Sequence, residues 1–296
     1  MSKLFDKLTE GGWNVAIRKR TDGLILADQQ TPFSLIPNSP RTWEADPFLF
    51  EHDDAVYVFS EMFDYITRKG SIGYSRLEGN CWSKWKVVID EPFHMSYPNV
   101  FQIGQDIFMV PETSADNSLR LYQAASFPDQ WKLVKVLAQD VKWADTTFWR
   151  EQDRLFAITR DISNWDAQRD LLLELNDQFD ILSITAIQET DPSMSRPGGK
   201  FFASHGTPFR VTQDCSTHYG GALLFSQFDS KELTAQGMTP PVLHLSPENL
   251  QLSVQRSWTG LHTYTISEHY EAIDVERRHF HLGGLLVRLL SKFKHL

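Results

Sequence analysis

The fold is decided by the stretch Trp43-Glu-Ala-Asp-Pro-Phe-Leu-Phe50, in which an acid and a proline lead into an apolar strand. A turn at residues 53–54 separates it from a second apolar run at 56–61, and further runs follow at 71–75 and 85–89. Short strands with turn residues between them predict one antiparallel sheet.

The same pattern starts again at regular steps along the chain. The opening residues of the repeats are Asp46, Tyr97, Asp145, Arg196 and His262, which gives steps of 51, 48, 51 and 66 residues. A period of about 50 residues with four strands per unit is typical of a β-propeller. We therefore predict an all-β protein, a five-bladed β-propeller whose fourth step is lengthened by an insertion around residues 230–257. A strand near the N-terminus, at residues 13–17 or 24–26, is expected to complete the last blade and close the ring.

The last residues differ from the repeats, because their apolar side chains recur at helical spacing while most basic residues fall outside this stripe. The stripe consists of Leu282, Leu285, Leu286, Leu289, Leu290 and Phe293. We predict a propeller at residues 1–279 and a short C-terminal amphipathic helix at 280–296. Two interpretations of this helix stay open. It packs against the propeller wall or a partner, or it lies at the interface with anionic lipid.

Composition argues against several classes of protein. A net charge of −9 argues against a general nucleic-acid binder, which needs clustered Lys and Arg. Two cysteines cannot form a disulfide scaffold, and neither the cysteines nor the ten histidines show metal-ligand spacing, so we predict no metal and no other cofactor. No run of 18 apolar residues and no apolar segment behind the first charged residues is present. We expect a cytoplasmic location, with a peripheral position at the inner membrane as one form of it.

Polar residues are expected to gather at one end of the propeller axis. The innermost strand of each blade runs along this axis, so the five opening residues converge there. The far ends of the second strands return to the same face and add Glu61, Glu112 and the pair Gln213-Asp214. Charged groups at such a place need water or one another, because burial of a lone charge is costly. The structural alternative is that each acid caps a turn or pairs with Arg196.

Paired carboxylates around a pocket suit the cleavage of a glycosidic bond. Asp46 is the candidate base, and Glu112 is the candidate acid because Val110 and Pro111 beside it are apolar. Asp145 would tune the pKa of the acid or hold a sugar hydroxyl. The residues expected to bind substrate are Glu61, His94, Tyr97, Arg196, Gln213, Asp214, Tyr219 and His262.

Ordered motifs across residues 40–275 resemble those of a known family. They include Trp43-x-Ala-Asp-Pro-Phe, Phe93-His-Met-Ser-Tyr-Pro, Met109-x-Pro-Glu-Thr-Ser, Ser195-Arg-Pro-Gly-Gly and Gly260-Leu-His-Thr. In this order they resemble the N-terminal propeller domain of the glucosamine inositolphosphorylceramide transferase family, which stand-alone bacterial proteins share. That domain is similar in fold to the five-bladed glycosidases of families 43 and 32.

The resemblance has implications for individual residues. It implies that Asp46 matches the first-blade acid of those glycosidases, which acts as base or nucleophile, and that His262 matches a last-blade histidine near the sugar. It supports Glu112 less, because the general acid of those enzymes usually sits in a third blade, where this chain has Asp145. In the plant transferase the transfer reaction is assigned to a separate C-terminal domain, so no transferase activity is carried over to these 296 residues.

Together these observations predict a propeller that processes a glycan or glycoconjugate in the manner of a glycosidase, within surface-polysaccharide metabolism. A glycoside hydrolase and a transglycosidase both stay open. The alternative is a non-catalytic glycan-binding or scaffolding module that serves a separate glycosyltransferase. The expected partners are a carbohydrate or glycoconjugate, no nucleic acid, and a membrane or glycosyltransferase contacted through residues 280–296.

Overall fold

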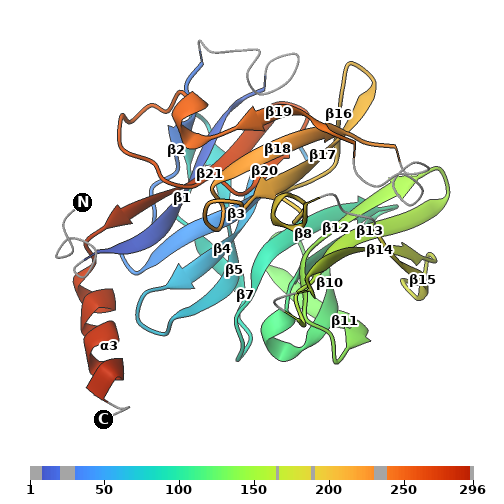
Figure 1. Ribbon diagram of the computed structural model, residues 1–296, viewed down its shortest axis with the longest axis horizontal. Coiled ribbons are helices and arrows are strands. Elements are labelled where there is room, and N and C mark those ends of the chain that lie inside the picture. The colour runs from blue at the N-terminus through green and yellow to red at the C-terminus, as the bar shows by residue number, and fades with distance from the viewer. Residues whose placement is uncertain (1–8, 21–30, 165–166, 188–190, 230–238, 294–296) are drawn as a thin grey trace.

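Five antiparallel sheets are arranged in a ring around one axis in the computed structural model (Figure 1). The structure describes residues 9–20, 31–164, 167–187, 191–229 and 239–293. Each sheet contains four strands, except the first along the chain, which contains five. The prediction of an all-β, five-bladed propeller with one short C-terminal helix is confirmed.

Four blades are built from strands that follow one another along the chain. The first blade contains β3 (Thr42–His52), β4 (Ala55–Asp64), β5 (Lys69–Glu78), β6 (Cys81–Trp82) and β7 (Lys86–Ile89). The second contains β8 (Ser96–Ile103), β9 (Asp106–Glu112), β10 (Ser118–Ser126) and β11 (Gln130–Gln139). The third contains β12 (Trp143–Glu151), β13 (Arg154–Asp161), β14 (Arg169–Leu175) and β15 (Ile181–Ala186). The fourth contains β16 (Phe202–Ser204), β17 (Thr207–Asp214), β18 (Ala222–Gln227) and β19 (Pro241–Leu245).

The fifth blade joins the two ends of the chain. It contains β1 (Glu10–Lys19) and β2 (Ser34–Leu35) beside β20 (Tyr264–Ile266) and β21 (Tyr270–His279). β1 pairs with β21 along the full length of both strands, which places the first and last strands side by side (Figure 1). The predicted closing strand at residues 13–17 lies within β1, and the alternative at residues 24–26 lies outside the described residues.

The stretched fourth step has a different cause from the single insertion that the sequence suggested. Residues 241–245 form β19, the outermost strand of the fourth blade, which pairs with β18. Farther on, Leu252 forms a β-bridge with Phe33, so the segment after β19 packs against the N-terminal part of the fifth blade. The added length therefore completes one blade and contacts the next.

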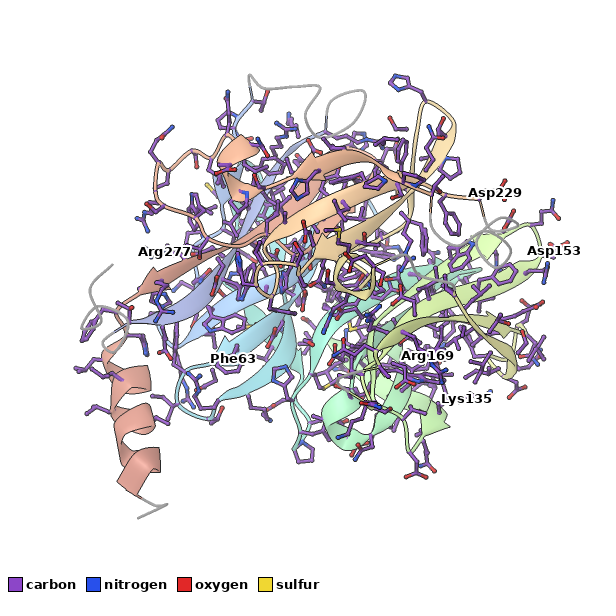
Figure 2. The ribbon with its side chains drawn as sticks, in the orientation of Figure 1. Phe63, Lys135, Asp153, Arg169, Asp229 and Arg277 are labelled. Atoms are coloured by element: carbon purple, nitrogen blue, oxygen red, sulfur yellow. The ribbon has the colours of Figure 1, made fainter. Side chains whose placement is uncertain are left out.

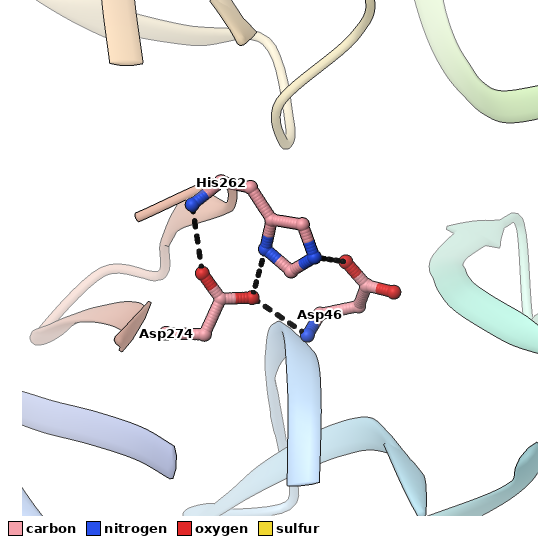
Figure 3. Close-up of side chains that lie close together, drawn as sticks. All are labelled: Asp46, His262 and Asp274. Carbon is pink, nitrogen blue, oxygen red and sulfur yellow. Dashed lines mark hydrogen bonds and ion pairs between the residues drawn. The ribbon is translucent and has the colours of Figure 1, made fainter. Parts of the chain in front are cut away.

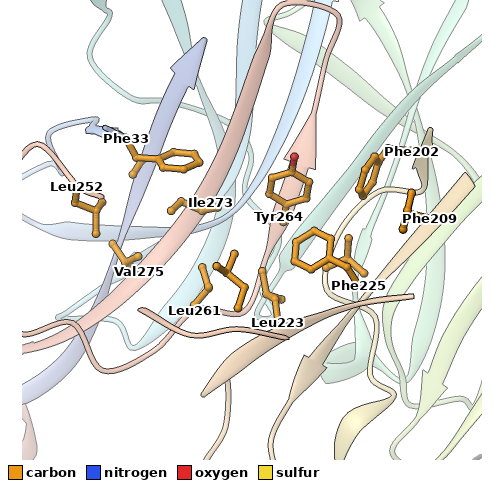
Figure 4. Packing of buried hydrophobic residues seen from close by; sticks show 13 residues of the cluster. Phe33, Phe202, Phe209, Leu223, Phe225, Leu252, Leu261, Tyr264, Ile273 and Val275 are labelled. Carbon is orange, nitrogen blue, oxygen red and sulfur yellow. The ribbon is translucent and has the colours of Figure 1, made fainter. Parts of the chain in front are cut away.

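Apolar clusters between neighbouring blades form the core. Between the fourth and fifth blades, Phe202, Leu223 and Phe225 pack with Tyr264 and Ile273 (Figure 4). Corresponding clusters lie between the other pairs of neighbouring blades. Each blade therefore buries both faces, which fits strands that carry apolar residues on either side.

Charged side chains occupy the periphery instead. Lys135, Asp153 and Arg169 all lie toward the rim of the ring (Figure 2). Asp153 and Arg169 are exposed and Lys135 is half-buried, so the charged groups that the fold does bury stand out against an otherwise ordinary core.

Helix α3 (Leu282–Phe293) follows β21 and stands beside the first blade, apart from the sheets (Figure 1). Within the described part of the chain, no helix is long and apolar enough to cross a membrane.

Candidate functional site

The same backbone device opens each of the first three blades. Asp46, Tyr97 and Asp145 have φ angles of 51°, 46° and 53°, in the left-handed region that L-residues rarely adopt. At each of them the pairing with the second strand shifts register, as in a β-bulge. A bulge changes the direction of a side chain. The three equivalent residues therefore interrupt the regular strand pairing at the same end of the ring.

A histidine between two aspartates forms one half of the site (Figure 3). His262 Nδ1 lies 2.6 Å from Asp274 Oδ2, and His262 Nε2 lies 3.6 Å from Asp46 Oδ1. The Asp274 carboxylate also accepts the backbone N–H groups of Asp46 at 2.9 Å, His262 at 3.1 Å and Thr263 at 2.9 Å. Asp274 thus joins the opening residues of the fifth and first blades.

Burial and the charges of the neighbouring residues together set the pKa values of His262 and Asp46. Burial by itself would lower the pKa of His262, but the carboxylates of Asp274 and Asp46 outweigh it and raise the pKa to about 9. Burial raises the pKa of Asp46 to about 6, against the opposing effect of His262. At neutral pH, His262 is therefore an imidazolium ion and Asp46 is largely ionised.

An arginine between two acids forms the other half of the site. Arg196 Nε donates to Asp145, and Arg196 Nη2 lies 3.5 Å from Glu112 Oε2. Gln213 Nε2 donates to Asp145 Oδ2 at 3.0 Å, and the Ser114 hydroxyl donates to Glu112 Oε1 at 2.6 Å. Burial raises the pKa of Asp145 to about 6, while the Arg196 guanidinium favours its ionised form.

Glu61 and His94 lie at the end of the first blade on the same side. Glu61 is 5% exposed, and its Oε1 lies 3.4 Å from His94 Nε2. Burial, together with the charges of Asp46 and Glu112, raises the pKa of Glu61 well above its ordinary value. Burial lowers the pKa of His94, so burial favours the uncharged form of both members of this pair.

Two predicted substrate-binding residues have partners that belong to the fold. Tyr97 is fully buried, and its hydroxyl accepts Gly199 N–H at 2.7 Å and lies 2.8 Å from Thr147 Oγ1, where it closes the axis below the charged groups. Asp214 Oδ2 lies 3.0 Å from His244 Nε2, within its own blade. Tyr219, by contrast, is 52% exposed and packs its ring against His262 and the Arg196 guanidinium.

The structure adds two residues that the sequence reasoning missed. Asp274 lies on β21, the second strand of its blade, as Glu61 and Glu112 do in theirs. Applying the repeat to the second strand of the fifth blade would have found it. Trp13 stacks on His262 with ring centroids 3.9 Å apart, and nothing in the repeat indicates this contact, because Trp13 comes from the closing strand.

Two clusters in the described residues bring three potential metal-ligand atoms within 4.8 Å of one another. One is the axial trio of Asp46, His262 and Asp274, and the other is an exposed group at Glu51, Glu268 and His269. In the axial trio, both ring nitrogens of His262 face carboxylates. The imidazolium ion itself therefore supplies the positive charge that two adjacent carboxylates require.

Two cavities lie away from the axial charges. One of about 500 Å³ is lined by Trp149, Phe201 and Phe228 beside the third and fourth blades, and one of about 670 Å³ is lined by turn residues that include His52 and His269. Neither is lined by an opening residue of a blade.

Solved structures to which this fold is similar include glycoside hydrolases. The chain is similar to an α-L-arabinofuranosidase of Podospora anserina, with a TM-score of 0.57 and 10% identity over 79% of this chain and 90% of that one. It is also similar to a thermostable family-43 glycoside hydrolase, with a TM-score of 0.55 and 12% identity over 83% of this chain and 93% of that one. At such identities the likeness shows the propeller fold alone.

Sequence comparison then gives the family. The family model described as glucosamine inositolphosphorylceramide transferase 1, N-terminal, matches residues 34–270, and the chain belongs to this family. It is 30% identical over 233 residues to glucosamine inositolphosphorylceramide transferase 1 of Arabidopsis thaliana, and 29% identical over 236 residues to the protein of that name from Oryza sativa subsp. japonica. The matches cover 75% and 77% of this chain but only 30% and 31% of the relatives, so the chain spans less than a third of their length.

Proposed function

We propose that the chain processes a glycan or glycoconjugate at the axial site with glycosidase-like acid–base chemistry. The observation that carries this proposal is the cluster of buried carboxyl groups at one end of the axis, in which burial raises the pKa of Asp46 to about 6 and that of Glu61 well above its ordinary value. The glycosidase-like fold and the name of the family, which refers to a sugar and a lipid headgroup, support the same substrate class.

Glycoside chemistry needs one ionised carboxylate and one proton donor. Asp46 suits the first role, because the Tyr97 N–H at 3.1 Å and the Thr263 hydroxyl at 2.8 Å both donate to its carboxylate. Such bonds favour the ionised form. Asp46 is then the base or nucleophile, as the sequence suggested.

For the proton donor, we assign Glu61 rather than Glu112. Arg196 lies against both Glu112 and Asp145, and an adjacent cation favours the ionised form of a carboxyl group. Among the described side chains, no Lys or Arg forms an ion pair with Glu61, and burial raises the pKa of its carboxyl group well above the ordinary value, which favours the protonated form. In this assignment Glu112 and Asp145 orient Arg196, which contacts the substrate together with Tyr219.

The test uses Asp46→Asn and Glu61→Gln, with Asp214→Asn as the matched control because Asp214 faces His244. Each protein is incubated with a total glycolipid and polysaccharide extract of the producing organism, and mass spectrometry detects new reducing ends or transferred sugars. We expect the first two variants to lose product by about 100-fold or more, the range of acid–base catalysis, and the control to keep it. Full turnover in Asp46→Asn would contradict the proposal.

A second candidate is a non-catalytic module that binds a glycan for a separate glycosyltransferase, and the Arg196 bridge favours it. A guanidinium held between Glu112 and Asp145 is a fixed, recognition-type arrangement. Binding of an extract component without any product would support this alternative. We propose a cytoplasmic location for either function, which cell fractionation tests.

A further inference from the structure

The C-terminal helix is fixed to the propeller at its first turn. The His281 ring stacks on Tyr65 with centroids 3.7 Å apart, and Tyr65 also hydrogen-bonds to His279. Glycine at 283 and 284 allows close approach, since a Cβ at Gly284 would lie 1.9 Å from a side-chain oxygen of Glu10. The direction in which α3 leaves the propeller is therefore set by packing.

Large apolar side chains around this first turn face solvent. Phe280, Leu282 and Leu286 are 58%, 59% and 51% exposed, and Ile66 of the adjoining turn is 44% exposed. The Ile66 side chain lies beside Gly283, so Ile66 adjoins the first turn of the helix. We call Ile66, Phe280, Leu282 and Leu286 the apolar helix patch. Contiguous exposed apolar surface of this kind marks an interaction site.

The C-terminal segment of the sequence has the opposite charge from the rest of the chain. After Glu276 the sequence contains five Lys and Arg residues and no acid, whereas residues 1–276 contain 24 Lys and Arg against 38 Asp and Glu. An acidic protein with one basic, apolar segment has a charge separation that suits an anionic partner. Leucine and phenylalanine next to Lys and Arg are the composition of helices that lie in the interface of a membrane.

The start of the helix lies at the site end of the blades. β21 ends at His279, opposite Glu10, and His279 contacts Tyr65 in the turn that follows β4. Glu61, whose carboxyl group belongs to the axial site, lies in the last part of β4, which ends at Asp64 just before this turn. A surface bound by the patch would therefore meet the propeller on the side where the axial site lies.

We propose that the apolar helix patch and the basic C-terminal segment dock the propeller onto an anionic lipid surface, with the axial site on the side of the membrane. Charge complementarity selects lipid phosphate over a neutral surface, and the exposed leucines insert between headgroups. An acidic protein surface would satisfy the charge but leave the apolar patch in contact with polar groups. The inference is independent of the axial chemistry, because it uses none of its side chains.

Co-sedimentation with vesicles tests the proposal on the full chain. Vesicles of equimolar phosphatidylcholine and phosphatidylglycerol are compared with vesicles of phosphatidylcholine alone. We expect binding to the anionic vesicles only. The affinity of Leu282→Ser/Leu286→Ser should be lower by at least about tenfold, because two leucine side chains that would be buried in the membrane are missing. Leu182→Ser is the matched control, since Leu182 is 61% exposed on the edge strand β15.

Each result decides the question. Binding that both Leu182→Ser and Asp46→Asn retain, and that the double variant loses, supports lipid docking whatever the axial site does. Equal binding of wild type and the double variant would overturn the assignment of the patch. Failure of the wild type to bind anionic vesicles would also overturn it and would leave an acidic protein as the partner to seek.

Discussion

Replacing Asp274 by Asn should destabilise the propeller at the place where the fifth and first blades meet. The Asp274 carboxylate accepts three hydrogen bonds from backbone N–H groups and forms an ion pair with His262 Nδ1, and it is fully buried. An amide offers one oxygen in place of two, and its NH2 group faces donors. It also leaves the His262 imidazolium without its nearest counter-charge. Removing one partner of a buried ion pair costs about 3–5 kcal/mol.

This loss translates into a measurable change in melting temperature. At about 2 °C per kcal/mol for a domain of this size, we expect the Tm to fall by roughly 6–10 °C. Thermal unfolding followed by circular dichroism measures it, with Asp53→Asn as control, because Asp53 is exposed and its φ of 48° suits Asn equally well. A second readout is the pKa of His262, which should fall from about 9 when the carboxylate is removed. A Tm change within that of the control, or an unchanged His262 titration, would refute the reasoning.

Three further predictions concern other buried groups of the axis. The pKa of His262 is about 9 in the folded state and near 6.5 in the unfolded state. Its stabilising effect is therefore complete below pH 6.5 and disappears as the pH rises through 9. In urea titrations, the difference in free energy of unfolding between wild type and His262→Gln should shrink by about 3 kcal/mol over that window. Burial lowers the pKa of Lys200 to about 7, so stability of wild type relative to Lys200→Met should rise between pH 7 and 10, and a flat difference would contradict this. Tyr97→Phe leaves Gly199 N–H without its acceptor and should cost about 1–3 kcal/mol in chemical denaturation; an unchanged midpoint would show that water replaces the hydroxyl.

The fold was predictable because each repeat has a recognisable local sequence pattern. Each blade opens on a polar residue, turns at a polar pair and returns on an apolar strand, and neighbouring blades pack through these strands. The closing strand at residues 13–17 was predictable only as one of two alternatives, because β1 pairs with β21 across the length of the chain. The insertion was misjudged because β19 is a short strand of five residues, partly exposed at the outer edge of its blade.

The composition of the axial site was predictable, but its pairing was not. The repeat indicated that Asp46, Asp145, Arg196 and His262 would converge, and they do. Which carboxyl each cation contacts depends on side-chain geometry at the axis, and so does the raised pKa of Glu61, which follows mainly from burial. Sequence spacing alone gives neither the ion-pair partners nor the pKa of Glu61.

Strained backbone and buried charge coincide at the openings of the first three blades. A residue before proline normally adopts an extended conformation, yet Asp46 and Tyr97 precede proline and have positive φ angles, as Asp145 does before threonine. Conformations of this kind cost on the order of 1–3 kcal/mol each and persist at functional sites. Asp tolerates the left-handed region better than Tyr, so the strain at Tyr97 is the largest and its buried hydroxyl bonds offset it. A propeller needs only a regular strand at these positions, so packing alone does not explain three strained openings around one set of charges. For that reason we place the chemistry at this end of the axis, and not in the aromatic cavity beside Trp149.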